Sequence, residues 1–157
     1  MKKIKKSLVG TVLHIGKPFE SHDGVSLNNR FMCIFSVESD HLMLMPMSAF
    51  HSKEQKNQRL NGIVNFEYSK KHGNTCDAYI KCNQIYVLRN EDFNNFDEIK
   101  LSRKINKEHF EKLQNHVKNL QKDSKNKFFK TVVNFKDLPR TIKKEQINKR
   151  KFDDYER

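Results

Sequence analysis

The sequence predicts a mainly β fold with some α structure, in which a small antiparallel β-barrel is followed by one helix and a basic tail. Three observations support this prediction. Five or six short segments have the length of strands and carry β-branched or alternating apolar residues. Residues 107–122 change to the period of a helix. Residues 138–157 are dominated by charge and lack a durable apolar period, which favours a flexible tail.

The first strands follow from apolar runs and the turns that separate them. Residues 7–15 alternate loosely and end at a Gly-Lys-Pro turn. A polar linker, residues 19–29, leads to two strongly apolar runs, residues 30–37 and 41–47. Because only a short polar turn separates these runs, we expect them to pair as a hairpin through the core.

Shorter segments continue the sheet. Residues 52–61 are polar and fit either a loop or a short helix. Residues 62–68 alternate between polar and apolar side chains, which predicts a half-buried strand. Residues 77–88 contain another strand-like segment, and residues 128–135 fit a further short strand.

The helix is predicted by its spacing and by its first residues. Asn106 is a plausible N-cap, and Glu108 lies in the first turn, where the helix dipole favours an anion. We therefore expect one domain over residues 1–137, with the barrel at about 7–100 and the helix at about 107–122. Apolar residues spaced three, four and three apart share one face of this helix: Phe110, Leu113, Val117 and Leu120.

The chain is basic, and its charge is unevenly distributed. It has 157 residues and a formal net charge of +12. Residues 1–100 hold 14 Lys and Arg against 11 Asp and Glu, whereas residues 101–157 hold 17 against 8. This asymmetry favours a polyanionic partner such as nucleic acid. The alternative is a lysine-rich surface that reflects an AT-rich genome and has no such partner.

Several functional classes lose support. No window reaches the roughly 18 apolar residues of a membrane span, and the basic N-terminus lacks the apolar region of a signal peptide, so we expect a cytoplasmic protein. Cys33, Cys76 and Cys82 form no CxxC pair and predict neither disulfides nor a zinc site, with Cys33 in the core. Motifs for phosphate loops, zinc peptidases, serine hydrolases and EF-hands are absent from the sequence, and we expect no metal and no cofactor.

The candidate site lies where two neighbouring strands end. Arg30 begins one strand of the predicted hairpin, and Ser48 follows the other strand. Antiparallel pairing brings both to the same edge of the sheet, near His51 and Lys53. A planar guanidinium, a hydroxyl and further cations at one edge form an arrangement that suits a phosphate.

The same segments resemble the MazF/PemK toxin family. The resemblance is carried by LVGTVLHI at 8–15, NRFMCIFS at 29–36, LMLMPMS at 42–48 and AYIKCNQIYVL at 78–88, and it covers roughly residues 7–122. It implies an SH3-like barrel, a homodimer and cleavage of single-stranded RNA under the control of an antitoxin. The family's arginine corresponds to Arg30 and its threonine to Ser48, whereas its usual proline is Phe31 here.

Metal-free ribonucleases use the RNA 2′-OH as nucleophile and leave a 2′,3′-cyclic phosphate. Arg30 suits the role of phosphate clamp, Ser48 can donate to a non-bridging oxygen, and His51, or else His22, is the candidate for proton transfer. We expect such an enzyme to inhibit translation and growth. The predicted RNA-binding residues are Asn29, His22, Lys53, Lys56, Arg59 and Tyr79.

Three alternatives stay open. Ser48, His51 and Lys53 also resemble the strand end of ToxN-like endoribonucleases, which an RNA antitoxin inhibits. A non-catalytic RNA-binding or ribosome-associated module on the same barrel is the second alternative, and a protein-interaction domain is the third. The remaining histidines lie on different predicted elements, and surface positions explain them better than a metal site: His14, His72, His109 and His116.

Overall fold

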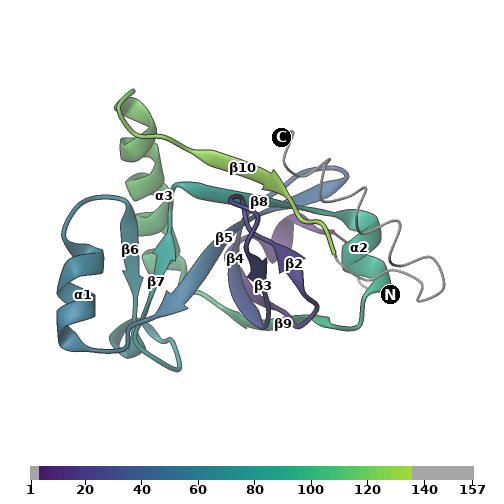
Figure 1. The fold of residues 1–157 in the computed structure, drawn as a ribbon, viewed down its shortest axis with the longest axis horizontal. Coiled ribbons are helices and arrows are strands. Elements are labelled where there is room, and N and C mark those ends of the chain that lie inside the picture. The colour runs from purple at the N-terminus through teal and green to yellow at the C-terminus, as the bar shows by residue number, and fades with distance from the viewer. Residues whose placement is uncertain (1–3, 136–157) are drawn as a thin grey trace.

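The computed structural model describes residues 4–135, so the predicted tail at 138–157 lies outside the described residues. Figure 1 shows a coiled sheet with short helices around it. The elements in chain order are η1 Lys6–Leu8, β1 Thr11–Ile15, β2 Phe19–Glu20, β3 Ser26–Leu27, β4 Arg30–Val37, β5 His41–Ala49, α1 Lys53–Leu60, β6 Asn65–Tyr68, η2 Lys70–His72, β7 Ala78–Lys81, β8 Gln84–Arg89, α2 Asn90–Asn95, β9 Ile99–Lys104, α3 Lys107–Lys122 and β10 Phe129–Val132.

Eight of the strands form one sheet. Its order is β10-β8-β5-β4-β1-β9, and β7 pairs with both β5 and β6. Neighbouring strands are antiparallel except β10, which runs parallel to β8. Within residues 4–135 the outermost strands β9 and β10 do not pair with each other, so this is an open sheet and not a closed barrel. The prediction of a mainly β fold with a helix is confirmed, whereas the sheet does not close into the predicted barrel.

The predicted hairpin is confirmed, with β4 and β5 in antiparallel register. Met32 lies opposite Pro46, and the register shifts between Ile34 and Ser36. The strand predicted at 77–88 is in two parts, β7 and β8, which both run antiparallel to β5. The interruption at residues 82–83 lets this segment follow the coil of the sheet.

Alternating side chains place one hydrophobic core on each face of the sheet. In β1, Leu13 and Ile15 face the first core, whereas Val12 faces the second. The first core also receives side chains from α2 and from the segments beside β2 and β10. The second core lies beneath α3. This double coverage explains why the central strands are apolar on both faces.

The helix prediction is confirmed, with α3 at Lys107–Lys122. The Asn106 side chain caps the helix by accepting a 2.9 Å hydrogen bond from the backbone N–H of Glu108. The four predicted apolar residues are all buried against the sheet. Burying a large aliphatic side chain stabilises the fold by about 1.5–3 kcal/mol, so this face attaches α3 firmly to the second core.

The sequence patterns did not predict the β2–β3 hairpin, helix α2 or strand β9. The predicted linker at 19–29 contains the small β2–β3 hairpin, whose strands have only two residues each. Helix α2 is one short turn that buries Phe93. Strand β9 is mostly exposed at the edge of the sheet and has no strong alternation. Short or edge elements depend on their neighbours and leave little periodicity in the sequence.

Cys33 is confirmed as a core residue, since it is fully buried and burial raises the pKa of its thiol far above the usual range. Cys82 is buried as well, and its pKa is raised to about 12 by burial. Neither thiol is ionised near neutral pH, so these two cysteines pack as small apolar side chains. In the described part of the chain, no helix has the length and hydrophobicity needed to cross a membrane.

Candidate functional site

Arg30 is the first residue of β4, directly after a tight backbone turn. Asn29 adopts a left-handed conformation with φ of 52°, which asparagine tolerates better than most residues. Arg30 then pairs with Ile15 of β1, which fixes its backbone in the sheet. The Nε atom of Arg30 is buried and has no hydrogen-bond partner among residues 4–135. A buried guanidinium nitrogen without a partner is a donor available to an anion.

Strand register brings the predicted Ser48 to the same face as Arg30. Arg30 lies two residues before Met32 in β4, and Ser48 lies two residues after Pro46 in β5, where the pairing of these two strands ends with Met32 opposite Pro46. Ser48 also pairs with Tyr79 of β7. Residues directly opposite each other point to the same side of a sheet, so all three lie on the face of the first core, at its end. The two residues therefore share a face at neighbouring strand ends, and their contact stays a prediction.

Lys81 is a site residue that was missed in the sequence. It is half-buried at the end of β7, two residues beyond Tyr79 and therefore on the same face. Burial lowers the pKa of Lys81, and the charges of Arg30 and Arg59 lower it further, while Asp23 opposes them. Arg30 and Arg59 are hence each close enough to Lys81 to repel its charge. A lysine within the apolar run AYIKC was the available signal in the sequence.

His22 lies beside this cationic cluster. It belongs to the turn between β2 and β3, and its backbone N–H donates a 3.1 Å hydrogen bond to the hydroxyl of Tyr86. Its ring lies 4.6 Å from the ring of Phe129. Burial raises the pKa of Tyr86, and Arg30 acts in the opposite direction, which places Arg30 within electrostatic range of that hydroxyl. The Nδ1 atom of His22 is buried without a hydrogen-bond partner in the described chain.

The other predicted proton-transfer residue, His51, has an exposed ring. It follows β5 and precedes α1, and its backbone N–H donates a 2.6 Å hydrogen bond to the side chain of Gln55. Ser52 caps α1 by accepting a hydrogen bond from the backbone N–H of the same Gln55. His51 is therefore placed at the entrance to α1, whereas His22 packs against Tyr86.

Helix α1 carries three of the predicted RNA-binding residues. Lys53 and Arg59 are exposed, and Lys56 is half-buried. Only Arg59 has a recorded electrostatic effect on Lys81. The helix buries no side chain, and the carbonyl of Arg59 accepts a 2.9 Å hydrogen bond from Asn65. This bond is one of the polar contacts that attach α1 to the sheet.

Tyr79 lies deeper than a base-stacking residue would. Its side chain is 5% exposed, and its ring stacks on Phe50 with centroids 4.9 Å apart. The ammonium of Lys56 lies 5.9 Å from the centroid of the Phe50 ring. Tyr79 thus supports Phe50, which supports Lys56, and this stack holds the start of α1 against the sheet.

Glu67 joins α1 to the turn after β6. Its carboxylate pairs with Lys56 at 2.9 Å and with Lys71 at 3.7 Å, and it accepts a 2.6 Å hydrogen bond from the hydroxyl of Ser69. Burial alone would raise the pKa of Glu67. The bonds from Ser69 and Lys56 outweigh that effect and hold the pKa below its usual value of 4.5. The ionised form is therefore favoured by folding.

This network predicts a dependence of stability on pH. A carboxyl group whose pKa is lowered by folding stabilises the protein above its unfolded pKa and loses that effect as pH falls through the folded value. We expect Glu67→Gln to lower the free energy of unfolding at pH 7 by about 1 kcal/mol, because the ion pair remains partly open to solvent. The difference should shrink below pH 4.5, as urea unfolding at several pH values would measure. A constant difference down to pH 3 would contradict this assignment.

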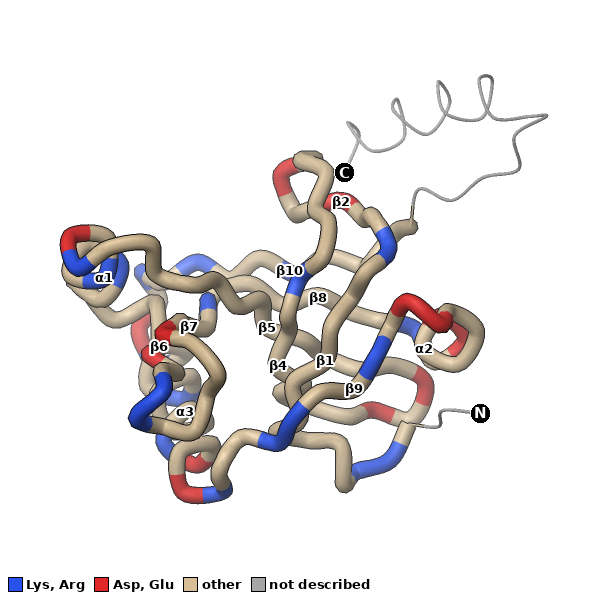
Figure 2. The backbone as a smooth tube through the Cα atoms, turned by 90° about the horizontal axis from the view of Figure 1, so that it is seen from below, with Lys and Arg blue, Asp and Glu red and all other residues tan. Residues whose placement is uncertain are grey.

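The surroundings of the site are rich in cations. Figure 2 shows Lys and Arg positions along β9 and on α1, with fewer acidic positions between them. Within residues 4–135, no group of three or more His, Cys, Asp and Glu side chains is placed to hold a metal ion. The geometry thus offers guanidinium, ammonium, hydroxyl and imidazole groups, which bind and protonate phosphate oxygens.

The chain was compared with protein families, curated proteins and solved structures. No family model matches the chain, and neither a curated protein nor a solved structure is found to be similar to it.

Proposed function

We propose that this protein is a metal-independent endoribonuclease, similar to the MazF/PemK toxins, that cleaves single-stranded RNA by attack of the 2′-OH. The observation that carries the proposal is the buried, unpartnered Nε of Arg30 beside Lys81. Keeping a guanidinium nitrogen buried without a partner costs free energy, which an RNA phosphate would recover. The ends of β4, β5 and β7 supply the rest of the site.

Each residue has a role that its chemistry supports. Arg30 holds two oxygens of the scissile phosphate, and Lys81 adds positive charge where the pentavalent transition state gains negative charge. Ser48 donates to a non-bridging oxygen from the opposite strand. His22 is the stronger candidate for proton transfer, because its backbone bonds to Tyr86, which lies within electrostatic range of Arg30, while His51 is exposed. Replacement of each histidine separately would distinguish them.

The RNA strand would run from the turn at Asn29 toward α1. Lys53 and Arg59 are exposed cations on that helix, and Arg59 also acts on Lys81. Lys56 is already paired with Glu67 and has a smaller share in phosphate binding. This route follows the sheet face that carries Ser48 and does not require Tyr79 to leave the core.

The proposal includes the cellular setting that the resemblance implies. We infer a cytoplasmic homodimer with an SH3-like barrel, opened here at its edge, that inhibits translation and growth until an antitoxin binds it. A protein antitoxin is the first choice, and an RNA antitoxin of the ToxN type is the second. No cofactor takes part in the reaction.

A second candidate function is RNA binding without cleavage. It is favoured by the position of His51, which is exposed beyond the strand end instead of facing Arg30 across a closed site. In that case the cations around Arg30 bind phosphates, and no side chain moves a proton. Cleavage products distinguish the two functions directly.

The decisive assay is incubation of the purified protein with single-stranded RNA in excess EDTA. We expect cleavage to persist and to leave a 2′,3′-cyclic phosphate with a 5′-OH, because cationic side chains replace the metal. Loss of cleavage on chelation and its return with a divalent ion would refute the mechanism. Binding of RNA with no cleavage under either condition would favour the second candidate function.

A further inference from the structure

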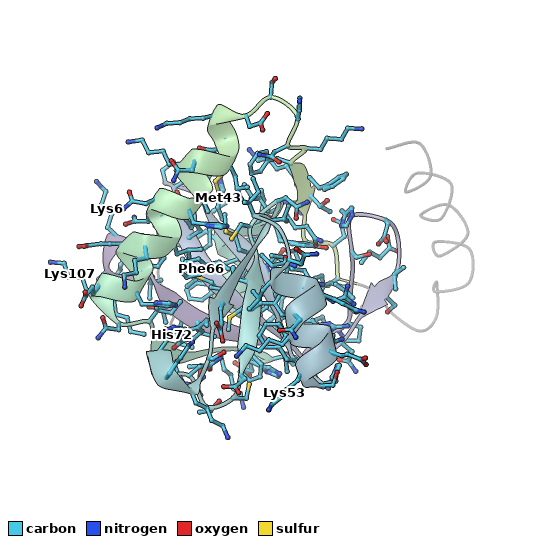
Figure 3. The ribbon with its side chains drawn as sticks, turned by 90° about the vertical axis from the view of Figure 1, so that its left-hand side faces the viewer. Lys6, Met43, Lys53, Phe66, His72 and Lys107 are labelled. Carbon is cyan, nitrogen blue, oxygen red and sulfur yellow. The ribbon has the colours of Figure 1, made fainter. Side chains whose placement is uncertain are left out.

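A basic cavity lies on the opposite face of the sheet from Arg30. It has a volume of about 550 Å³ and lies between the turn after β6 and the first turns of α3. The residues that matter here are Lys71, His72, Lys104, Glu108, His109 and Lys112. Tyr68 also lines the cavity and belongs to the core beneath α3. Met32, which is on the same face of β4 as Arg30, belongs to the core on the other face of the sheet. Figure 3 shows His72 beneath the Lys107 end of α3.

Two stacked histidines form one wall of this cavity. The rings of His72 and His109 lie 4.0 Å apart at an angle of 15°. Nε2–H of His109 donates a 2.9 Å hydrogen bond to the carbonyl of Glu67, so its Nδ1 lacks a proton in the neutral ring. Nδ1 of His72 accepts a 3.1 Å hydrogen bond from the backbone N–H of Ser69. Backbone groups therefore fix both rings in neutral tautomers.

Positive charge surrounds the pair. Lys71, Lys104 and Lys112 line the cavity from the turn, from β9 and from α3, and Glu108 is the one carboxylate among its lining residues. Burial lowers the pKa of His72, and His109, Lys71 and Lys112 lower it further, while Glu67 opposes them. Burial and Lys112 also lower the pKa of His109. The free cavity thus holds excess positive charge and two histidines that resist protonation.

We propose that this cavity is a binding site for a phosphoryl or similar oxyanion group, separate from the site around Arg30. Lys112 offers its ammonium from α3. Lys71 and Lys104 add positive charge from two other elements, although Lys71 also pairs with Glu67 and Lys104 also donates to the carbonyl of Ser7. The first turn of α3 adds the positive end of the helix dipole. An anion placed among them would offset the repulsion between the lysines and the imidazoles. The source of the group is either a small phosphorylated molecule or the backbone of a nucleic acid, since both present the same oxygens.

The stacked pair makes the binding depend on pH. An anion stabilises protonated imidazole, so binding should be accompanied by proton uptake at Nδ1 of His109, because Nδ1 of His72 already accepts the bond from Ser69. Two parallel imidazolium rings 4.0 Å apart would repel, and hence the pair takes up one proton. The charged groups around the pair are Glu67, Lys71, Lys104, Glu108 and Lys112. Affinity should therefore rise as pH falls from 7.5 to 6.

The test is an NMR titration of the full chain labelled at histidine, at low ionic strength. Sulfate is the first probe, because its charge is constant over this pH range, and a short single-stranded oligouridylate is the second. We expect the signals of His72 and His109 to shift until the site is saturated. The affinity for the probe should be higher at pH 6 than at pH 7.5. If only sulfate shifts these signals, the ligand is a small molecule. If the oligonucleotide binds with higher affinity than sulfate, the ligand is a nucleic-acid backbone.

A matched pair of variants distinguishes anion binding in this cavity from nonspecific attraction to the basic surface. Lys112 and Lys118 are both exposed on α3, but only Lys112 lines the cavity. Lys112→Gln should weaken binding by roughly fivefold to tenfold, as expected when one charge-assisted hydrogen bond is removed, and Lys118→Gln should leave it unchanged. Equal weakening by both variants, or no selective shift of the two histidines with either probe, would overturn the proposal. Arg30→Ala should not alter this binding, so the result is independent of the proposed nuclease.

Discussion

Substitution of Arg30 by alanine is expected to lower RNA cleavage by roughly 10²–10³-fold, the usual effect of removing one preorganised group that stabilises charge in a transition state. The planar guanidinium of Arg30 can hold two phosphate oxygens at once. Its Nε is buried without a partner, so truncation removes no internal hydrogen bond from that atom. The Tm should therefore change little, and induced expression of the variant should no longer arrest growth.

Two controls make this result specific. Arg89 is exposed at the end of β8, and Arg89→Gln removes the same charge from the same sheet without touching the site. We expect it to retain cleavage. Arg30→Lys keeps the charge but loses the planar fork, and its activity should lie between the two. Toxicity of Arg30→Ala that persists at a matched soluble level would remove Arg30 from the catalytic role.

Truncation of Leu113 to alanine is expected to cause the largest loss of stability. Leu113 is fully buried in the core beneath α3, and its removal leaves a cavity between the helix and the sheet. Changes of this kind cost about 2–5 kcal/mol, which corresponds to a fall in Tm of about 10 °C for a chain of this size. Thermal and urea unfolding followed by circular dichroism would measure it.

The chain provides its own control for this effect. Leu101 of β9 is 43% exposed, so Leu101→Ala removes the same methylene groups from a largely solvated position. We expect it to change stability by less than about 0.5 kcal/mol. A similar loss from both variants would mean that β9 is covered in solution by a part of the protein or a partner, and that the burial of Leu113 is not the decisive difference.

Local patterns were enough to predict the elements whose stability depends on their own residues. Helix α3 was predicted to the residue because its cap at Asn106 and its apolar face lie within one continuous segment. The hairpin of β4 and β5 followed for the same reason, since two apolar runs and a short turn specify their own pairing. That hairpin places Arg30 and Ser48 on the same face of the sheet.

Elements that depend on distant partners were harder to predict. Strand β9 is held by β1, which lies more than eighty residues earlier, and its own sequence is mostly polar. The parallel pairing of β10 with β8 also lacks any local signal, because it is set by the path of α3 between them. The same strand contacts the ring of His22 through Phe129, so the tertiary fold decides the surroundings of this histidine.

The sequence by itself determined the mainly β class, the position of α3 and the hairpin whose strands carry Arg30 and Ser48, because each depends on periodicity or on a short turn. Only the tertiary structure decided that Lys81 and Arg59 join Arg30, that Tyr79 is buried, and that His72 stacks on His109. These arrangements combine side chains from segments far apart in the chain. Their energies come from burial and from charge at short distance, and neither is defined until the sheet has coiled and α3 has packed against it.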